Sequence, residues 1–325
     1  LFCRVIRRIF WLGLWIFGLA LLIWYPLRWW PGDRFVAVRL VNYFMPWLLV
    51  VLIPGLVLAG LARRVWLGVT LAIPTLLISL TFAPLFLPRP TLAQAGSTPL
   101  KVMSYNKLWR NGNINAMQDL IRQEDPDIIL LQEIYPKTAR KLKERLADDY
   151  PDSELHLAYD PYLYQAIISR YPLTPAASAP KHGRVQKVTV HTPDGPIAVW
   201  NVHPHPPLPW SRQYREIARL VDDIAAVEGP LIVGGDFNTT DQAETYRMIN
   251  QHLANAHWEA GWGFGFSFPS THRRFKGVVP LPSLIRIDHI FYSDHFYALT
   301  AGTVARSGGS DHLPVVAELI WQNHR

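Results

Sequence analysis

Residues 231–238 read LIVGGDFN, in which an apolar run leads into two glycines and a set of polar side chains. The apolar run has the length and composition of a buried β-strand. Asp236 and Asn238 stand just past its end, where a rigid strand can aim polar side chains into a cleft. The stretch therefore predicts a strand that carries a functional site at its carboxyl end.

The same arrangement, a polar side chain at the end of an apolar segment, recurs along residues 100–325. A single case has an ordinary explanation, because an Asn after a strand is usually a turn residue. Together the residues supply carboxylates for a hard cation such as Mg²⁺ or Mn²⁺, and groups that move protons and stabilise a phosphate. The further members are Asn106 after KVMSY, Glu133 after DIILLQ, His203 after IAVWNV, Asp288 in RIDHIFYS, and Asp311 and His312 in GGSDHLPVV.

Hydrophobic periodicity places further elements around these positions. The mixture of strands and helices, with several adjacent strand pairs, predicts an α/β (α+β) sandwich of two packed β-sheets flanked by helices. The turn TPDG at 192–195 predicts a hairpin. Strands are predicted at 100–105, 127–131, 165–169, 186–191, 197–202, 287–292 and 315–320, and helices at 114–123, 136–147, 211–227 and 241–253.

The motifs MSYN, LLQE, NVH, GDFN, IDHI and SDH occur in an order and spacing that resembles the endonuclease/exonuclease/phosphatase superfamily. That family includes pancreatic-type DNases, exonuclease-III-like repair enzymes, inositol-polyphosphate phosphatases and neutral sphingomyelinases. The segment ISRYPL at 168–173 is similar to the family's Ser–Arg strand segment, which makes Arg170 a candidate substrate ligand. The resemblance covers essentially all of 100–325. It implies a four-layer DNase-I-like sandwich and a metal-dependent phosphoric ester hydrolase.

The resemblance also implies a metal-binding half of the site. Glu133 is then the principal metal ligand, helped by Asn106 and Asp311. Asp236 orients or deprotonates the attacking water, and Asn238 donates to the phosphate. The cofactor implied is Mg²⁺ or Mn²⁺.

Three further residues complete the catalytic set that the resemblance implies. His312 stabilises or protonates phosphate oxygens, and Asp288 holds its ring and raises its basicity. His203 lies on the opposite side of the phosphorus, as a donor to it or to the leaving group. Which group acts as the base stays open.

Substrate contacts are less sharply indicated. His205 follows His203 by two residues, so strand alternation puts both on one face; it either contacts substrate or metal, or is a loop residue shaped by its proline neighbours. Arg273 and Arg274 lie in the one basic cluster, where they could meet phosphates or anionic lipid headgroups. Lys107 stands where some DNA-repair members carry an acid, which puts a second metal contact in doubt.

The charge of the chain is unevenly distributed. Residues 1–99 contain nine Arg, no Lys and the single acid Asp33, whereas residues 100–325 hold 23 basic and 24 acidic residues. The formal net charge of +7 therefore belongs to the N-terminal segment. Because the second part has no positive field, nucleic-acid binding is not favoured. Cys3 is the single cysteine, so the chain has no internal disulfide.

Three charge-free stretches, 9–27, 40–62 and 65–88, are each long enough to cross a hydrocarbon core of ~30 Å as a helix. They predict an all-α transmembrane anchor of three helices over residues 1–88. Residues 89–99 read as a short linker, and residues 100–325 as the catalytic domain.

Orientation follows from the Arg residues that flank these stretches. Five lie at the N-terminus and the second turn, against four on the other side. The cluster of Arg4, Arg7 and Arg8 precedes the first helix, which usually dominates. We therefore expect a multi-pass inner-membrane protein with a cytoplasmic N-terminus. Three crossings then place the catalytic domain in the periplasm or on the cell surface.

The apolar loop at 278–285 and the aromatic residues that precede it are either core or a membrane-facing lip around the cleft. A tethered hydrolase with such a lip suits a lipid-linked phosphate ester, such as a phospholipid or a polyprenyl phosphate or pyrophosphate. The chain also resembles bacterial family members with three N-terminal membrane helices, some linked to cell-envelope functions and glycopeptide resistance. The alternative is a tethered endo- or exonuclease, and a non-catalytic binding module is a third class. The sequence leaves the oligomeric state open.

Overall fold

The computed structural model describes residues 2–87, 98–150, 154–176, 184–270, 274–275, 279–280 and 282–322. They form two compact units. The first holds residues 1–87 with 242–244, and the second holds residues 88–241 and 245–325.

One six-stranded sheet of the second unit has the strand order β13-β14-β1-β2-β4-β3. The pair β1–β2 is parallel, and the other pairs are antiparallel. Both β1 and β2 end at the same edge, where Asn106 lies opposite Gln132. The strands are β1 Leu100–Asn106, β2 Ile128–Gln132, β3 His156–Asp160, β4 Gln165–Ser169, β13 Phe296–Thr303 and β14 Val315–Trp321.

The other six-stranded sheet has the order β5-β6-β7-β8-β12-β9, and β7–β8 is its parallel pair. The predicted hairpin is confirmed, because β6 and β7 pair as far as Thr192 and Gly195. A separate pair joins β10 (Arg274–Phe275) to β11 (Val279–Pro280). The strands are β5 Leu173–Pro175, β6 Val185–Thr192, β7 Gly195–Val202, β8 Leu231–Asp236, β9 Ala254–Asn255 and β12 Asp288–Tyr292.

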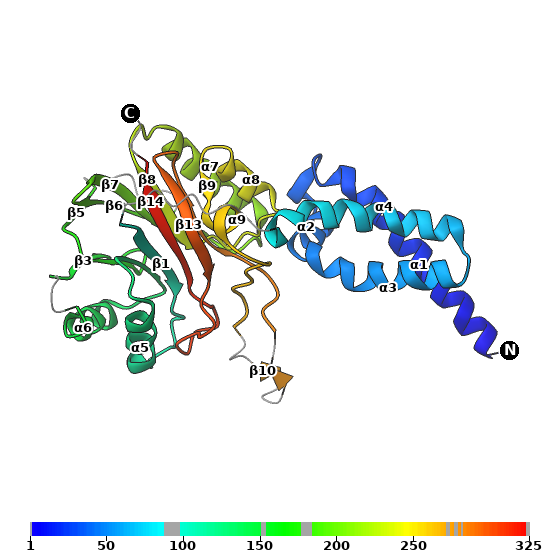
Figure 1. The fold of residues 1–325 in the computed structure, drawn as a ribbon, viewed down its shortest axis with the longest axis horizontal. Helices are drawn as coiled ribbons and strands as arrows, with labels where there is room; N and C mark the ends of the chain where they lie inside the picture. Colours follow the sequence, from blue (N-terminus) through cyan, green and yellow to red (C-terminus); the bar gives the residue numbers. More distant parts are fainter. Residues whose placement is uncertain are drawn as a thin grey trace. The chain divides into compact units, whose positions relative to one another are not determined.

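The two sheets pack face to face, and helices cover their outer faces (Figure 1). Val102 and Ile128 of one sheet meet Val199 and Ile232 of the other in the central core. Apolar faces of α5 and α6 bury the outside of the first sheet, and those of α7 and α8 bury the outside of the second. The predicted four-layer sandwich is thus confirmed. The helices are α5 Ile114–Glu124, α6 Pro136–Ala147, α7 Trp210–Ala225, α8 Glu244–Asn250 and α9 Ala256–Ala260.

The N-terminal unit is helical, but its middle segment differs from the prediction. Two helices, Phe2–Leu27 and Val65–Phe86, are long and apolar enough to cross a membrane. The middle segment is bent by 81° between Val36–Tyr43 and Met45–Leu61, so residues 40–62 are not one straight helix, and the bent pair counts as a third span only if it crosses as one unit. Pro46 lies at this break and has no N–H to continue the helical ladder. The elements are α1 Phe2–Leu27, η1 Gly32–Arg34, α2 Val36–Tyr43, η2 Met45–Leu48, α3 Leu49–Leu61, α4 Val65–Phe82 and η3 Ala83–Phe86.

Three of these helices pack against one another through small residues. A Cβ on Gly18 of α1 would meet Thr70 of α4 at 2.9 Å, and one on Gly55 of α3 would meet Leu14 of α1 at 3.1 Å. Such close approach is typical of helix packing in membranes, where small residues let backbones come together. Large apolar side chains of all three helices remain exposed on the outside. The unit therefore has the surface expected of a lipid-embedded bundle.

Candidate active site

The two sheets bring their polar strand ends to one place. Asn106 ends β1 and Glu133 follows β2 in the first sheet. In the second sheet, His203 follows β7 and Asp236 ends β8. Asp288 opens β12, and because β12 runs antiparallel to β8 it lies directly opposite Asp236. Side chains far apart in the sequence therefore meet at one edge of the sandwich.

Two of these positions carry backbone strain. Glu133 and Asn238 adopt left-handed conformations, with φ of 56° and 51°. Such conformations are costly for residues other than glycine and cluster at active sites. Each is held in place. Trp109 N–H donates to Glu133 Oε2 at 3.0 Å, and Asn238 N–H donates to Asp236 Oδ1 at 2.9 Å.

The GGSDH loop is joined to the end of β1 by two hydrogen bonds. Tyr105 Oη donates to the carbonyl of Ser307 at 2.8 Å, and Ser310 Oγ donates to the carbonyl of Asn106 at 2.6 Å. Gly308 has a φ of 57°, and a Cβ there would lie 2.8 Å from Tyr105 Oη. The paired glycines thus let the loop pass close to β1 and carry His312 into the site.

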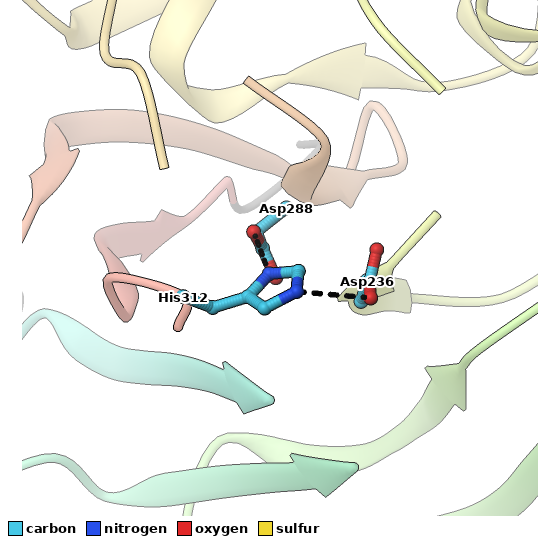
Figure 2. Close-up of side chains that lie close together, drawn as sticks. All are labelled: Asp236, Asp288 and His312. Atoms are coloured by element: carbon cyan, nitrogen blue, oxygen red, sulfur yellow. Dashed lines mark hydrogen bonds and ion pairs between the residues drawn. The ribbon is translucent and has the colours of Figure 1, made fainter. Parts of the chain in front are cut away.

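His312 and Asp288 form a buried pair at the heart of this cluster (Figure 2). His312 Nδ1 lies 2.9 Å from Asp288 Oδ2, and its Nε2 lies 3.7 Å from Asp236 Oδ2. Burial alone would lower the pKa of His312, but Asp288 and Asp236 outweigh it and raise the pKa to about 10. The imidazole is therefore a cation at neutral pH.

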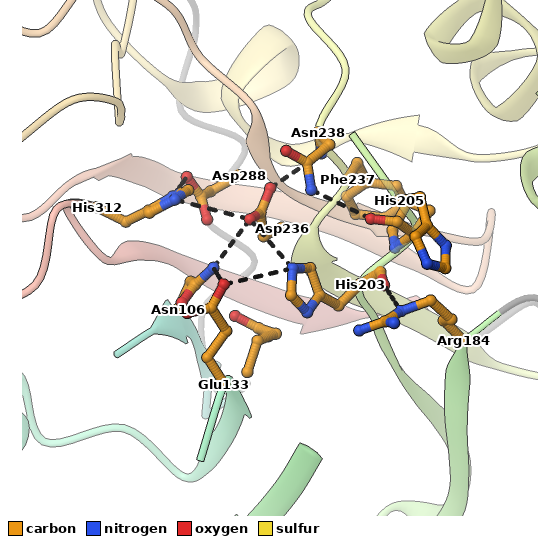
Figure 3. Close-up of polar contacts among 12 residues, drawn as sticks. Asn106, Glu133, Arg184, His203, His205, Asp236, Phe237, Asn238, Asp288 and His312 are labelled. Carbon is orange, nitrogen blue, oxygen red and sulfur yellow. Dashed lines mark hydrogen bonds and ion pairs between the residues drawn. The ribbon is translucent and has the colours of Figure 1, made fainter. Parts of the chain in front are cut away.

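Asp236 is shared by both halves of the site (Figure 3). Asn106 Nδ2 donates to Asp236 Oδ2 at 2.9 Å and lies 3.4 Å from Glu133 Oε1. Burial raises the pKa of both Glu133 and Asp236 above its usual value. The hydrogen bonds and histidines around the two carboxylates only partly offset this burial, and a bound cation would relieve the rest.

His203 faces the same two carboxylates but is not ion-paired with them. Its Nε2 lies 3.8 Å from Glu133 Oε1 and 3.6 Å from Asp236 Oδ2. Burial lowers the pKa of His203 to about 4, so the ring is neutral at pH 7. It can donate one N–H to a substrate oxygen without adding charge.

The donor set fits a divalent metal ion. Asp236, Asp288 and His312 each bring one potential ligand atom to within 4.8 Å of the others. The alternative, which the sequence motifs imply, centres on Glu133 and Asn106. We favour this second position, because His312 Nδ1 and Asp288 Oδ2 are already bonded to each other and Mg²⁺ prefers oxygen ligands. Ligation by Asn106 would require its amide to turn, because its Oδ1 now accepts the N–H of Leu108.

The other metal candidate, Asp311, adjoins His312 in the GGSDH loop. Its side chain is buried, and its carboxylate contributes to the raised pKa of His312. It therefore lies close enough to act on the cluster electrostatically.

Arg170 is not brought to the cluster. Because β4 runs antiparallel to β2, the end of β4 lies at the opposite end of β2 from Glu133. The guanidinium of Arg170 pairs there with Asp125 and Asp127. These ion pairs hold Arg170 away from the cluster, and its contact with substrate stays a sequence prediction.

The other substrate candidates have different outcomes. His205 lies beside the cluster, and its Nδ1 is 2.7 Å from Glu216 Oε1 of α7. Arg273 falls outside the described residues, and of Arg274 the structure describes only the backbone, in β10. Those two remain sequence predictions.

Two features of the site were not singled out from the sequence. Arg184 stands just before β6, and its Nε donates to the carbonyl of His203 at 2.7 Å. The rings of Trp109, Tyr135 and Tyr164 meet at centroid distances of 5.0 to 5.8 Å beside Glu133. Arg184 could have been noticed from the sequence, because it directly precedes β6, and β6 pairs with the strand β7 that leads into His203. The three rings come from separate loops, so no local pattern joins them.

Comparison with known proteins agrees with this geometry. The sequence model of the Endonuclease/Exonuclease/phosphatase family matches residues 103–312. A family protein from Bacteroides thetaiotaomicron has a TM-score of 0.54 and 18% identity, over 70% of this chain and 99% of that one. The mannosyl-6-phosphatase Bt3783 of the same organism has a TM-score of 0.53 and 16% identity, over 68% and 100%. A truncated Caenorhabditis elegans TDP2 gives 0.54 and 17%, over 69% and 98%. Among curated proteins, none matches the chain.

Proposed function

The chain belongs to the endonuclease/exonuclease/phosphatase family, and from that premise we propose that it is a membrane-anchored phosphoesterase acting on an amphiphilic phosphate ester of the cell envelope. Its cofactor is Mg²⁺ or Mn²⁺. Residues 1–88 form the anchor, 89–99 a linker and 100–325 the catalytic domain. The observation that carries the proposal is the convergence of Glu133, Asp236 and the His312–Asp288 pair at one edge of the sandwich.

The metal would be held by Glu133 with Asn106 and Asp236 beside it, and when bound it neutralises phosphate oxygens. Asp236 is placed to hold the attacking water, because its Oδ2 lies between Asn106, His203 and His312. Its raised pKa suits it to accept a proton from that water.

The two histidines bind different oxygens of the phosphate group. His312, kept cationic by Asp288, donates from Nε2 to a phosphate oxygen and stabilises the charge that develops there. Neutral His203 donates on the other side, toward the leaving oxygen. Asn238 supplies a further amide donor, from a side chain fixed by its bond to the Pro204 carbonyl at 3.1 Å.

Aromatic side chains of the segment that contacts His312 support an amphiphilic substrate. The ring of Phe268 lies 4.8 Å from that of His312, and Phe264 and Phe266 stack at 5.1 Å further along the same segment. Trp262, in the same segment, is 66% exposed. A segment rich in aromatic residues that includes both a contact to a catalytic residue and an exposed Trp is typical of sites that meet a membrane or a lipid chain. The helices of the N-terminal unit would keep the domain at that membrane.

The test is a substrate panel on the full-length protein in detergent. Phospholipids, a polyprenyl diphosphate and plasmid DNA are each incubated with Mg²⁺ or Mn²⁺, with and without chelator. We expect chelator-sensitive lipid turnover that Glu133→Gln abolishes and Glu144→Gln leaves intact, because Glu144 is exposed on α6.

Two outcomes would contradict this. DNA nicking without lipid turnover would make the protein a tethered nuclease. No chelator-sensitive hydrolysis of any substrate, together with lipid binding that survives Glu133→Gln, would make it a binding module.

A further inference from the structure

Two basic residues lie on the far side of His203 from the His312–Asp288 pair (Figure 3). Arg184 and His205 lie there, next to the metal-binding half of the site. Neither has a part in the chemistry described above. Their contacts indicate a second binding position.

Arg184 is held by the backbone carbonyl of His203, and its guanidinium group points toward the site (Figure 3). Its Nε donates to the His203 carbonyl at 2.7 Å, and among the described residues nothing bonds to its two terminal nitrogens. The guanidinium is partly buried, and burial lowers its pKa. Glu216 acts most strongly on its charge, Arg212 opposes it, and the carboxylates of Glu133 and Asp236 act on it as well, so it lies within electrostatic reach of the metal-binding half. A partly desolvated guanidinium is a strong ligand for phosphate oxygens.

His205 is oriented by a single carboxylate. Glu216 of α7 accepts the backbone N–H of His205 at 2.8 Å and lies 2.7 Å from its Nδ1. This arrangement fixes the ring and leaves Nε2 for a ligand, as carboxylate-backed histidines do in other binding sites. Within the described part of the chain, Nε2 has no hydrogen-bond partner. A second guanidinium, that of Arg212, lies nearby, with its Nε 3.8 Å from Glu216 Oε1.

We propose that Arg184 and His205 form a subsite for a second phosphoryl group, so that the preferred substrate is a diphosphate ester. This rests on the proposed function and narrows its substrate class. The second group must lie next to the first, because Arg184 is bonded to the backbone of His203 itself. A small, compact group of basic residues of this kind differs from the basic stripe that tracks a nucleic-acid backbone.

The reaction then balances without a further reactant. The water held by Asp236 adds its oxygen to the phosphorus of the first phosphoryl group, and the bond from that phosphorus to the bridging oxygen breaks. The bridging oxygen keeps the electron pair and leaves on the phosphate that Arg184 and His205 hold. The proton taken by Asp236 passes to solvent.

Direct binding tests the subsite independently of turnover. Methylenediphosphonate and methylphosphonate are titrated calorimetrically into the full-length protein in detergent, with Mg²⁺ in excess. We expect the diphosphonate to bind about 10- to 100-fold more tightly, as one or two charged hydrogen bonds allow. In Arg184→Gln and in His205→Gln that preference falls at least about tenfold, while methylphosphonate affinity stays within about twofold.

Matched controls separate the subsite from general damage. His191→Gln and Arg122→Gln remove exposed residues of the same types and should leave both affinities unchanged. Arg184→Lys keeps the charge and should keep part of the preference. Chelation of Mg²⁺ by the diphosphonate is the same for every variant and cancels in the comparison.

Three results would overturn the subsite. The first is that the wild type binds methylenediphosphonate and methylphosphonate with equal affinity. The second is that Arg184→Gln and His205→Gln lose affinity for both ligands to the same extent. The third is that an oligonucleotide competes for the site as well as the diphosphonate does and depends equally on Arg184. If the diphosphonate preference holds but no phosphoester is hydrolysed, the subsite stands and the proposed function fails.

Discussion

Asn106 is the residue at which the contributions of the two sheets meet. Its amide donates to Asp236 of one sheet and approaches Glu133 of the other, in a place where two carboxylates would repel each other. An amide donor can bridge them in the way a cation does, but more weakly. The site is therefore preorganised for a cation, because its carboxylates already converge.

The His312–Asp288 pair gives a prediction with a definite sign. In Asp288→Asn the main charge that raises the pKa of His312 is gone, and burial then favours the neutral ring. We expect the rate to fall about 10²- to 10⁴-fold at pH 8. The decline in rate that we expect for the wild type as the pH rises toward about 10 should begin at lower pH in the variant. The measurement is a pH–rate profile, with the exposed Asp294→Asn as control. An unchanged alkaline limb would remove His312 from its role as acid.

The raised pKa values of Glu133 and Asp236 predict how metal affinity depends on pH. A carboxyl must lose its proton before it binds Mg²⁺, so protons compete with the metal. We expect the affinity to fall as the solution is acidified, and to begin falling at a higher pH than for carboxyls of ordinary pKa. Calorimetric titration with Mg²⁺ at a series of pH values, from neutral down to the ordinary carboxyl pKa of about 4, measures this. Constant affinity across that range would show that these carboxyls are not ligands.

Single residues show where sequence reasoning stops. Asp236 and Asn238 could be placed because they end an apolar strand. Arg170 also ends one, but its strand runs the other way, and direction is decided by pairing partners distant in the sequence. The partner of His205 is likewise on a helix 11 residues further along.

At the scale of elements, the loop after β1 depends on one buried lysine. Lys107 Nζ donates to the carbonyls of Leu108, Trp109 and Asn111 at 3.0 to 3.3 Å, and the side chain is 1% exposed. Trp109 in turn donates its N–H to Glu133. Some DNA-repair members of the family carry an acid at the position of Lys107, as a second metal contact. This chain has a lysine there instead, and that lysine shapes the loop that supports Glu133.

Lys107→Met should loosen the loop after β1. Its three carbonyls lose their donor, which we expect to cost ~2–4 kcal/mol of unfolding free energy. Because the loop also holds Glu133, Mg²⁺ affinity should fall as well. Denaturant unfolding and metal titration of the full-length protein measure the two effects. Lys141→Met, on the exposed face of α6, is the control. Unchanged metal affinity in Lys107→Met would contradict the link between the loop and Glu133.

Most strands with clear alternation or strong apolar runs could be predicted, and weakly patterned ones could not. β13 reads FYALTAGT, with small and polar residues and a register shift at Ala298 and Thr300, so it lacks a period-two signal. The helix expected over 241–253 is shorter, because Asp241 is used in a 2.6 Å ion pair with Arg286 instead of opening the helix. Tertiary pairing, absent from local sequence, decided both cases.

At the scale of the whole molecule, the bend in the middle segment decides the side of the membrane. Two crossings would leave the catalytic domain on the side of the N-terminus, and three would put it on the other. The packing of α3 against α1, through Gly55 and Leu14, favours three. We therefore keep the proposal of a periplasmic or cell-surface catalytic domain.

Cys3, the single cysteine, is a natural reporter of this topology. A membrane-impermeant maleimide should label Asp294→Cys in intact cells and leave Cys3 unlabelled until the membrane is permeabilised. Asp294 is suited because its side chain is 86% exposed. The same labelling pattern for both positions in intact cells would mean an even number of crossings.

Phosphate release from a membrane-embedded substrate tests the central claim most directly. Full-length wild type, Glu133→Gln and Glu144→Gln are reconstituted in vesicles that contain a polyprenyl diphosphate, and Mg²⁺-dependent inorganic phosphate is measured. The account predicts release by the wild type and by Glu144→Gln, with at least a ~100-fold loss in Glu133→Gln, since a metal ligand is removed. Equal release by all three proteins, or none from lipid alongside cleavage of DNA, would contradict it.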